Sequence, residues 1–393
     1  VRAADGCGTT TAGPASCVVG LEGCARLSAM SQTRPEQDQQ PVDLATDLLQ
    51  TMDQVTQDAL NFGYRIEQGF TQFRQRSAER RGDRPVMVAF DCYGTTDHVR
   101  ILGRALYKTH GPEDPTAEDE TSIRGWRSFT SIPISFAHVD VEIEGVQFRL
   151  VADKGGVIDA DVEISLEPGV HTARLRTAGS AWATSRIWVV DDSQRIGVVS
   201  DIDDTVMVTA LPRPMLAAWN SFVLNEHARD ATPGMPVLLE RLRRRHRGLP
   251  FIYLSTGAWN VAPTLRRFLS RNAYPPGTLL LTDWGPTTDR WFRSGPRHKV
   301  ENLEQLAREF PHMKWILIGD DGQHDPEIYG GFAQRYPQNV AAVVIRTLSP
   351  TEAVLASGRL LTADGPELPE GIPLIRANDG ASISEQLEEH GLL

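Results

Sequence analysis

The sequence has no run of about eighteen apolar residues, the length that a membrane-spanning helix requires, so no such helix is expected. It also has no excess of positive charge, because the formal net charge over 393 residues is -11. Nucleic-acid binding needs cationic side chains that neutralise phosphates, so we expect no nucleic-acid partner. The same charge provides no general attraction to anionic membranes. The balance of 40% hydrophobic and 23% charged residues is typical of a soluble globular protein.

Cysteine is scarce, and three of the four residues lie close to the start of the chain. They are Cys7, Cys17, Cys24 and Cys92. No two of them have the CxxC spacing of a zinc site, so zinc is not expected. A body with one cysteine is typical of a protein from a reducing compartment, and we therefore predict a cytoplasmic location.

No secretory signal is expected either, because the chain does not open with basic residues followed by an apolar segment. Residues 1–40 are rich in Gly, Thr, Ser, Gln and Ala and show little apolar periodicity, so we predict that they are disordered. The first methionine is Met30. We hypothesise that residues 1–29 are not part of the natural product; finding them in the intact mass of native protein would contradict this.

Residues 41–84 are predicted to contain a long amphipathic helix. Apolar residues from Leu44 to Phe73 recur at about the α-helical period of 3.6. Five arginines follow, where positive charge favours the helix dipole: Arg74, Arg76, Arg80, Arg81 and Arg84. We expect the helix to pack on its own protein. The alternative is peripheral contact with a membrane surface or a partner.

Residues 85–192 contain short segments with alternating apolar and polar residues, the period of a β-strand. The expected strands are Val86–Phe90, Val99–Leu102, Val139–Ile143, Val162–Leu166, Thr172–Arg176 and Ile187–Val190. Because no helical pattern separates them, they predict a β-sandwich. This region has no catalytic cluster, and we interpret it as a targeting, regulatory or packing module. Tyr93–Asp97 is expected to be a turn.

Residues 193–393 alternate between strand and helix patterns, which predicts an α/β domain with a parallel sheet. The expected strands are Ile196–Ser200, Phe251–Ser255, Thr278–Leu281, Trp315–Gly319, Val340–Ile345 and Ile372–Ile375. The expected helices cover about 235–247, 260–271, 298–310, 326–337 and 382–387. The insert 206–233 follows the first strand, and we predict that it covers the site and selects the substrate.

Polar residues follow the first of these strands directly. Asp201, Asp203, Asp204 and Thr205 lie within five residues. Neighbouring carboxylates repel at the end of a buried strand, and a hard cation such as Mg²⁺ relieves that repulsion through oxygen ligands. The spacing therefore favours a metal site over a simple acidic turn.

Three further groups of polar residues are expected at the same edge, because the carboxyl ends of parallel strands lie together. Ser255 and Thr256 lie at the end of the second strand, His298 and Lys299 begin a helix, and Asp320 and Asp321 follow another strand. Each also has an ordinary structural interpretation. Ser255 could cap a helix, Lys299 could lie on a surface, and Asp325 before Pro326 is most simply a helix N-cap.

Together these residue types suit aspartate-based phosphoryl transfer. Asp201 is the expected nucleophile and Asp203 the expected acid and base. Ser255, Thr256, Thr205 and Lys299 are expected to hold the phosphoryl group, with Lys299 neutralising its charge. The predicted Mg²⁺ ligands are Asp201, the backbone carbonyl of Asp203, and Asp320 or Asp321.

Several motifs resemble the haloacid-dehalogenase superfamily and, more narrowly, the phosphatidate phosphatase family of the yeast actin-patch protein and its bacterial relatives. They are Ser200–Val206, Tyr253–Ser255, Trp259–Asn260, His298–Lys299 and Gly319–Tyr329. Upstream, Tyr93–Thr95, Arg100 and Gly103–Arg104 resemble the β-module of bacterial members. Where the family often has Ser-Pro, this chain has Gly257-Ala258, so either Ser255 or Thr256 could hold the phosphate.

The resemblance implies a Rossmann-like catalytic domain behind the β-sandwich and an Mg²⁺-dependent reaction. The reaction would convert phosphatidate into diacylglycerol and phosphate through an aspartyl-phosphate. The implied roles are nucleophile for Asp201, acid/base for Asp203 and phosphate binding for Ser255 and Lys299. Alternatives are a phosphatase of a soluble phosphomonoester and a non-catalytic scaffold that recruits partners. The oligomeric state is not predicted.

Overall fold

The computed structural model describes residues 75–108, 132–208, 230–282, 288–349, 352 and 366–393, without the side chains of 288–294. The chain divides into two units, 1–64 and 65–393, and every described residue lies in the second. Residues 75–81 are helical. The predicted disorder of 1–40, the long helix before residue 75 and residues 209–229 of the insert lie outside the described residues.

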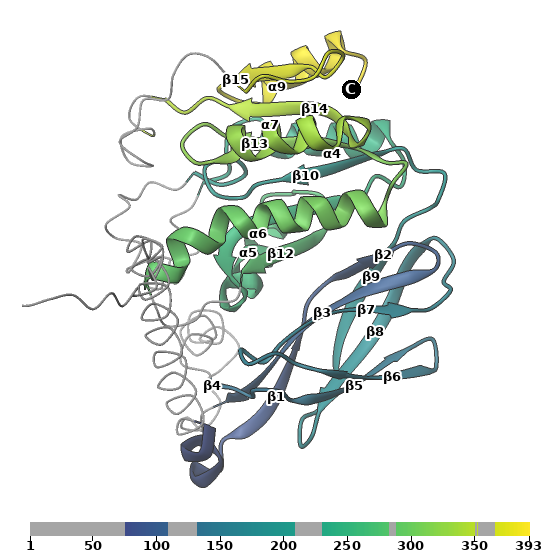
Figure 1. The fold of residues 1–393 in the computed structure, drawn as a ribbon, viewed down its shortest axis with the longest axis vertical. Helices are drawn as coiled ribbons and strands as arrows, with labels where there is room; N and C mark the ends of the chain where they lie inside the picture. Colours follow the sequence, from purple (N-terminus) through teal and green to yellow (C-terminus); the bar gives the residue numbers. More distant parts are fainter. Residues whose placement is uncertain (1–74, 109–131, 209–229, 283–287, 350–351, 353–365) are drawn as a thin grey trace, which may run out of the picture. The chain divides into compact units, whose positions relative to one another are not determined.

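A six-stranded sheet forms the centre of the carboxy-terminal half (Figure 1). Its strands are β10 (Ile196–Ser200), β11 (Phe251–Ala258), β12 (Thr278–Thr282), β13 (Lys314–Asp320), β14 (Val340–Arg346) and β15 (Leu374–Ala377). The order is β12-β11-β10-β13-β14-β15, and every neighbouring pair is parallel. This confirms the predicted α/β class and parallel sheet. From β10 the chain continues to β11 and β12 on one side, and β13, β14 and β15 lie on the other side. Parallel sheets bind ligands at such a change in the order of connection.

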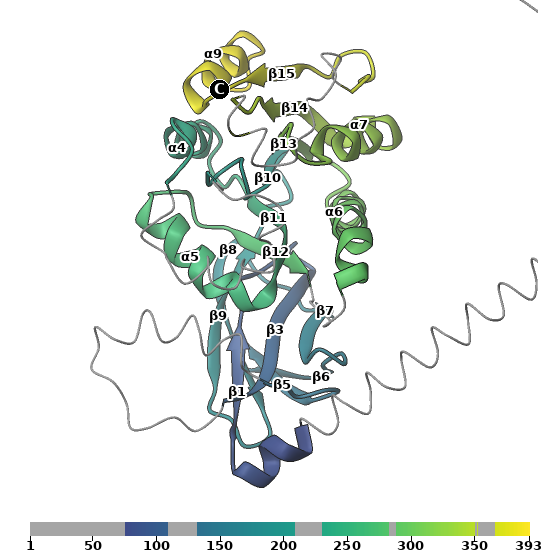
Figure 2. The same cartoon turned by 90° about the vertical axis from the view of Figure 1, so that its left-hand side faces the viewer.

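Helices lie on both faces of this sheet, with α4 and α5 on one side and α6 and α7 on the other (Figure 2). Their bounds are α4 (Met235–Arg245), α5 (Ala262–Arg271), α6 (Thr288–Glu309) and α7 (Asp325–Arg335), and α9 (Gly380–Glu389) follows β15. Short 3-10 turns are η3 (Trp259–Val261) and η4 (Pro337–Asn339). No helix in the described ranges has the length and apolar character needed to cross a membrane.

Helix α6 differs from the sequence prediction. We expected it to begin near His298, where the helical pattern of the sequence starts. Instead it begins at Thr288 and contains Pro296 in its interior. Lys299 therefore lies within the helix rather than at its start.

The remaining strands form a nine-stranded sheet in the order β1-β3-β2-β9-β8-β5-β6, with β4 and β7 also paired to β3. The strands are β1 (Arg84–Ala89), β2 (Cys92–Gly94), β3 (His98–Lys108), β4 (Ile132–Pro133), β5 (His138–Ile143), β6 (Val146–Val151), β7 (Val157–Glu163), β8 (Gly169–Thr177) and β9 (Ala183–Val189). The β-sandwich arrangement stays a prediction. Sequence patterns missed β2, β4 and β6, of which β2 occupies part of the expected turn.

Candidate active site

Hydrogen bonds of its backbone hold the loop after β10 in place. Asp201 is buried, and its N–H donates to the carbonyl of Ile318 on β13 at 2.8 Å. The carbonyl of Ile202 accepts from Val206 and Met207, which closes a single tight turn. Within the turn Asp204 has a φ of 57°, a left-handed conformation that costs energy for a residue with a side chain. The Nη1 atom of Arg346 donates to the carbonyl of Asp204 at 2.7 Å and helps to hold this conformation.

Three buried carboxylates meet beyond the ends of β10 and β13. They belong to Asp201, Asp320 and Asp325, and one oxygen of each lies within 4.8 Å of the others. The Oδ2 atom of each has no hydrogen-bond partner in the described structure. Unpaired buried carboxylate oxygens are unfavourable, and they are the ligands that Mg²⁺ prefers. The donor set therefore fits a hard divalent cation.

Lys299 is buried between two of these carboxylates. Its Nζ atom donates to Oδ1 of Asp201 at 2.7 Å and to Oδ1 of Asp325 at 2.5 Å. The side chain of Lys299 is 2% exposed, which excludes the surface interpretation of this lysine. One ammonium thus faces two carboxylates from different elements of the fold.

The pKa values in this cluster shift in the directions that burial and charge dictate. Burial raises the pKa of Asp201 well above its usual range, although Lys299 acts in the opposite direction. Burial and the charges of Asp325 and Asp201 also raise the pKa of Asp320. Burial alone would lower the pKa of Lys299, but Asp201 and Asp325 raise it well above its usual value. The two carboxylates therefore favour the charged form of Lys299.

Ser255 connects the second strand to the acidic loop. Its Oγ atom donates to Oδ2 of Asp203 at 3.1 Å and accepts from the Gly257 N–H at 3.0 Å. It does not cap a helix: α5 begins after Val261 and has no side-chain cap. The backbone carbonyl of Thr256 accepts a hydrogen bond from the Thr282 hydroxyl at 2.9 Å.

The other predicted site residues lie in varied places. Thr205 is fully buried, and its hydroxyl has no hydrogen-bond partner in the described structure. Asp321 points to the following loops, where Oδ1 accepts from the Leu348 N–H at 2.9 Å and Oδ2 lies 3.8 Å from Arg376. Asp320, in contrast, belongs to the buried cluster with Asp201 and Asp325.

Asp325 is the site residue that the sequence reading missed. We expected it to cap α7, but the N-cap position belongs to His324, and Asp325 is fully buried beside Lys299. The glycine before the acidic pair could have indicated this. A Cβ atom at Gly319 would lie 2.4 Å from Oδ2 of Asp325, so only glycine leaves room for that carboxylate.

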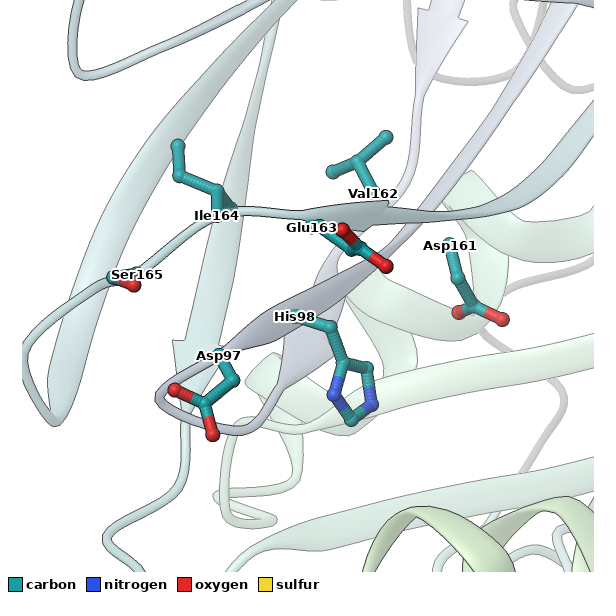
Figure 3. A pocket seen from close by; sticks show the side chains of 7 residues that line it. All are labelled: Asp97, His98, Asp161, Val162, Glu163, Ile164 and Ser165. Carbon is teal, nitrogen blue, oxygen red and sulfur yellow. The ribbon is translucent and has the colours of Figure 1, made fainter.

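A separate pocket of about 740 Å³ lies on the nine-stranded sheet (Figure 3). Asp97 and His98 line it from the start of β3, and Asp161 and Glu163 line it from β7. The pocket contains none of the residues around Lys299. The buried aspartates are the stronger candidate site, because they combine converging carboxylates, a buried cation and unpaired oxygens.

Part of this chain, which includes the candidate site, is similar to known proteins. The family model described as "Phosphatidate phosphatase APP1, catalytic domain" matches residues 196–347. Among curated proteins, phosphatidate phosphatase APP1 of Saccharomyces cerevisiae is 27% identical over 155 residues. An uncharacterized protein of Schizosaccharomyces pombe, C29B5.04c, is 24% identical over 156 residues. Each match covers 39% of this chain and 26% of the relative, so the chain matches about a quarter of the relatives' length.

Among solved structures, a carbohydrate acetylesterase from Xanthomonas citri is 11% identical, with 70% of this chain and 76% of that chain covered. Its TM-score of 0.24 is too low to show a shared fold. The family-model match is more informative, because residues 196–347 include the three aspartates and Lys299. Residues 196–347 are therefore similar to the catalytic domain of phosphatidate phosphatase APP1.

Proposed function

We propose that this protein is an Mg²⁺-dependent phosphatidate phosphatase that produces diacylglycerol and phosphate through an aspartyl-phosphate. The observation that carries the proposal is the Lys299 ammonium, which is buried between Asp201 and Asp325 at 2.7 and 2.5 Å. A nucleophilic carboxylate needs such a fixed cation nearby if it is to approach an anionic phosphoryl group. We also propose that the catalytic domain has the Rossmann-like fold of the haloacid-dehalogenase superfamily and follows a β-sandwich.

In the proposed reaction, Asp201 attacks phosphorus and the bond to the leaving lipid oxygen breaks. Asp203 gives a proton to that oxygen and later takes one from the water that hydrolyses the aspartyl-phosphate. Ser255, whose hydroxyl already contacts Asp203, and Lys299 hold the phosphoryl oxygens. Thr205 and Thr256 are proposed to complete the substrate site.

Mg²⁺ would neutralise charge on the phosphoryl oxygens, and its proposed ligands are Asp201, Asp320, Asp325 and the backbone carbonyl of Asp203. The orientation of Asp321 toward Leu348 favours Asp320 as the ligand of that pair. Replacing Asp320 with Asn should lower turnover by about a hundredfold or more, whereas Asp321→Asn should retain most of it. Equal losses in both variants would contradict this ligand set.

A soluble phosphomonoester is the alternative substrate, which the net charge of -11 favours because that charge does not attract anionic lipid surfaces. The non-catalytic scaffold is less well supported, because nothing in a scaffold requires a buried lysine between two aspartates. We propose a cytoplasmic location with peripheral membrane contact during catalysis.

The deciding experiment measures Mg²⁺-dependent phosphate release from phosphatidate in mixed micelles, with the parent protein and Asp201→Asn. Activity that only the parent shows supports the nucleophile and the lipid substrate together. If the parent hydrolyses only a small aryl phosphate and Asp201→Asn does not, the mechanism stands and the lipid is wrong. Equal activity of parent and variant would exclude Asp201 as the nucleophile.

A further inference from the structure

Arg100 is a buried arginine of the nine-stranded sheet that contacts the catalytic domain. It lies on β3 and is 4% exposed. Its Nε and Nη2 atoms donate to both carboxylate oxygens of Asp159 at 2.6 and 2.7 Å. The remaining donor, Nη1, is 3.0 Å from Oδ1 of Asn302 and 3.0 Å from the Tyr93 hydroxyl. Asp159 therefore fixes the guanidinium plane. Nη1 points toward α6, a helix that packs on the six-stranded sheet.

The partner of Arg100 on α6 is Asn302, which lies about one helical turn from Lys299. Asn302 follows Lys299 by three positions, so both side chains lie on the same side of the helix. The amide of Asn302 also donates to the His298 carbonyl at 2.9 Å. A second contact supports the same helix at its end, where the Tyr93 hydroxyl donates to Oε2 of Glu309 at 2.7 Å.

Helix α6 needs such support because of Pro296. Proline has no N–H, so the hydrogen bond to the carbonyl four residues earlier is missing, and a helix bends easily at such a point. Pro296 lies three residues before Lys299. The helix backbone before Pro296 therefore fixes the position of Lys299 only weakly, and contacts after it become important.

We propose that Arg100 is a positioning residue for the phosphatase reaction: through Asn302 it fixes α6 so that Lys299 remains between Asp201 and Asp325. A residue of the nine-stranded sheet thus helps to fix the position of Lys299 without itself being a substrate-binding residue. The activity measurements that test this proposal also depend on the proposed function. The labelling measurement depends only on the contacts described above.

The activity test is a double-mutant cycle with Arg100→Gln and Lys299→Met, measured as kcat and KM for phosphate release. We expect Arg100→Gln to lower kcat by about 10 to 100-fold with little change in KM, as for a misplaced catalytic group. In the Lys299→Met background the same change should have no further effect. Full additivity of the two losses would overturn the proposal, because Arg100 would then act independently of Lys299.

Two further variants separate positioning from general stability. Arg149→Gln removes another ion-paired arginine of the same sheet, but one with a side chain that is 73% exposed, and it should leave kcat unchanged. Asn302→Leu removes the partner of Arg100 from the α6 side and should reproduce the loss in Arg100→Gln. If Arg100→Gln does not fold, Asn302→Leu replaces it in the cycle.

A labelling measurement tests the proposal without any substrate. The chain has only four lysines, Lys108, Lys154, Lys299 and Lys314, so acetylation by acetic anhydride can be followed at each by mass spectrometry. Lys299 should be strongly protected in the parent and react about tenfold faster in Arg100→Gln, with exposed Lys314 as internal reference. Unchanged protection of Lys299 would contradict the proposal. A parent without phosphatase activity but with the expected labelling would refute only the proposed function.

Discussion

At the scale of single residues, the buried candidate site balances one positive charge against several carboxylates. Lys299 compensates Asp201 and Asp325, which both lie within hydrogen-bond distance of its ammonium. Removing one partner of a buried ion pair leaves the other charge without compensation, and that is costly. The metal-free protein is therefore expected to depend strongly on this lysine.

We predict that Lys299→Met lowers the free energy of unfolding of the metal-free protein by about 3–5 kcal/mol. Added Mg²⁺ should recover part of this loss, since it can compensate the same carboxylates. Urea unfolding with EDTA and with Mg²⁺ measures both effects, and Lys314→Met, at an exposed position, is the control. A loss that Mg²⁺ does not reduce would argue against a cation site at these aspartates.

His298 predicts a dependence of stability on pH. Burial lowers its pKa from 6.5 to about 4, with a smaller contribution in the same direction from the charge of Arg100. Between these values the unfolded chain binds a proton that the folded protein does not, so stability should fall as pH decreases from about 6.5 to about 4. The loss is at most about 3 kcal/mol. Unfolding curves of His298→Gln should lack this part of the pH dependence; an unchanged pH profile would exclude His298 as its source.

At the scale of the element, the turn between β13 and α7 is built around a missing side chain. A Cβ atom at Gly319 would meet Oδ2 of Asp325, whereas one at Gly331 in α7 would meet nothing within 4 Å. The two glycines therefore form a matched pair for substitution by alanine.

We predict that Gly319→Ala displaces the Asp325 carboxylate and weakens Mg²⁺ binding about tenfold or more, with about 1–3 kcal/mol of lost stability. Gly331→Ala should leave Mg²⁺ binding unchanged and slightly stabilise the helix. Isothermal titration with Mg²⁺ and thermal unfolding compare the two. Equal Mg²⁺ affinities would show that Asp325 is not a ligand.

The elements also show what sequence patterns can predict. Five of the six parallel strands, β10 to β14, matched their predicted segments within a few residues, because apolar runs identify buried parallel strands. The helical pattern put Lys299 at the start of a helix, but α6 already begins at Thr288 and continues through Pro296. Asp325 before Pro326 was interpreted as an N-cap, but that position belongs to His324. Short strands such as β2 carry too few residues for a period to be visible.

The whole described unit contains two sheets that share buried contacts. The Phe90 and Trp259 rings stack with centroids 4.4 Å apart. Asp91, which is 4% exposed, accepts hydrogen bonds from Arg186 on β9 at 2.7 Å and from Arg266 on α5 at 3.0 Å. These contacts link the β-module to the segment that follows Ser255. We therefore expect the two sheets to unfold together.

We predict a single calorimetric transition for residues 65–393, which Asp91→Ala shifts to lower temperature by a loss of about 1–3 kcal/mol. Asp140→Ala is the matched control. It also removes a carboxylate between two arginines, Arg149 and Arg176, but its contacts stay within one sheet and are more exposed. Two separate transitions in the parent protein would show that the sheets unfold independently.

Backbone hydrogen bonds join the two described ends of the insert next to the Asp201 loop. After the Asp201 loop, the Val208 N–H donates to the Asp230 carbonyl, and the Thr232 N–H donates to the Val206 carbonyl. These bonds close the connection on the domain side, independently of the residues between them. Segments of different length and composition can therefore be exchanged at this junction during evolution or in engineering while the aspartates keep their positions.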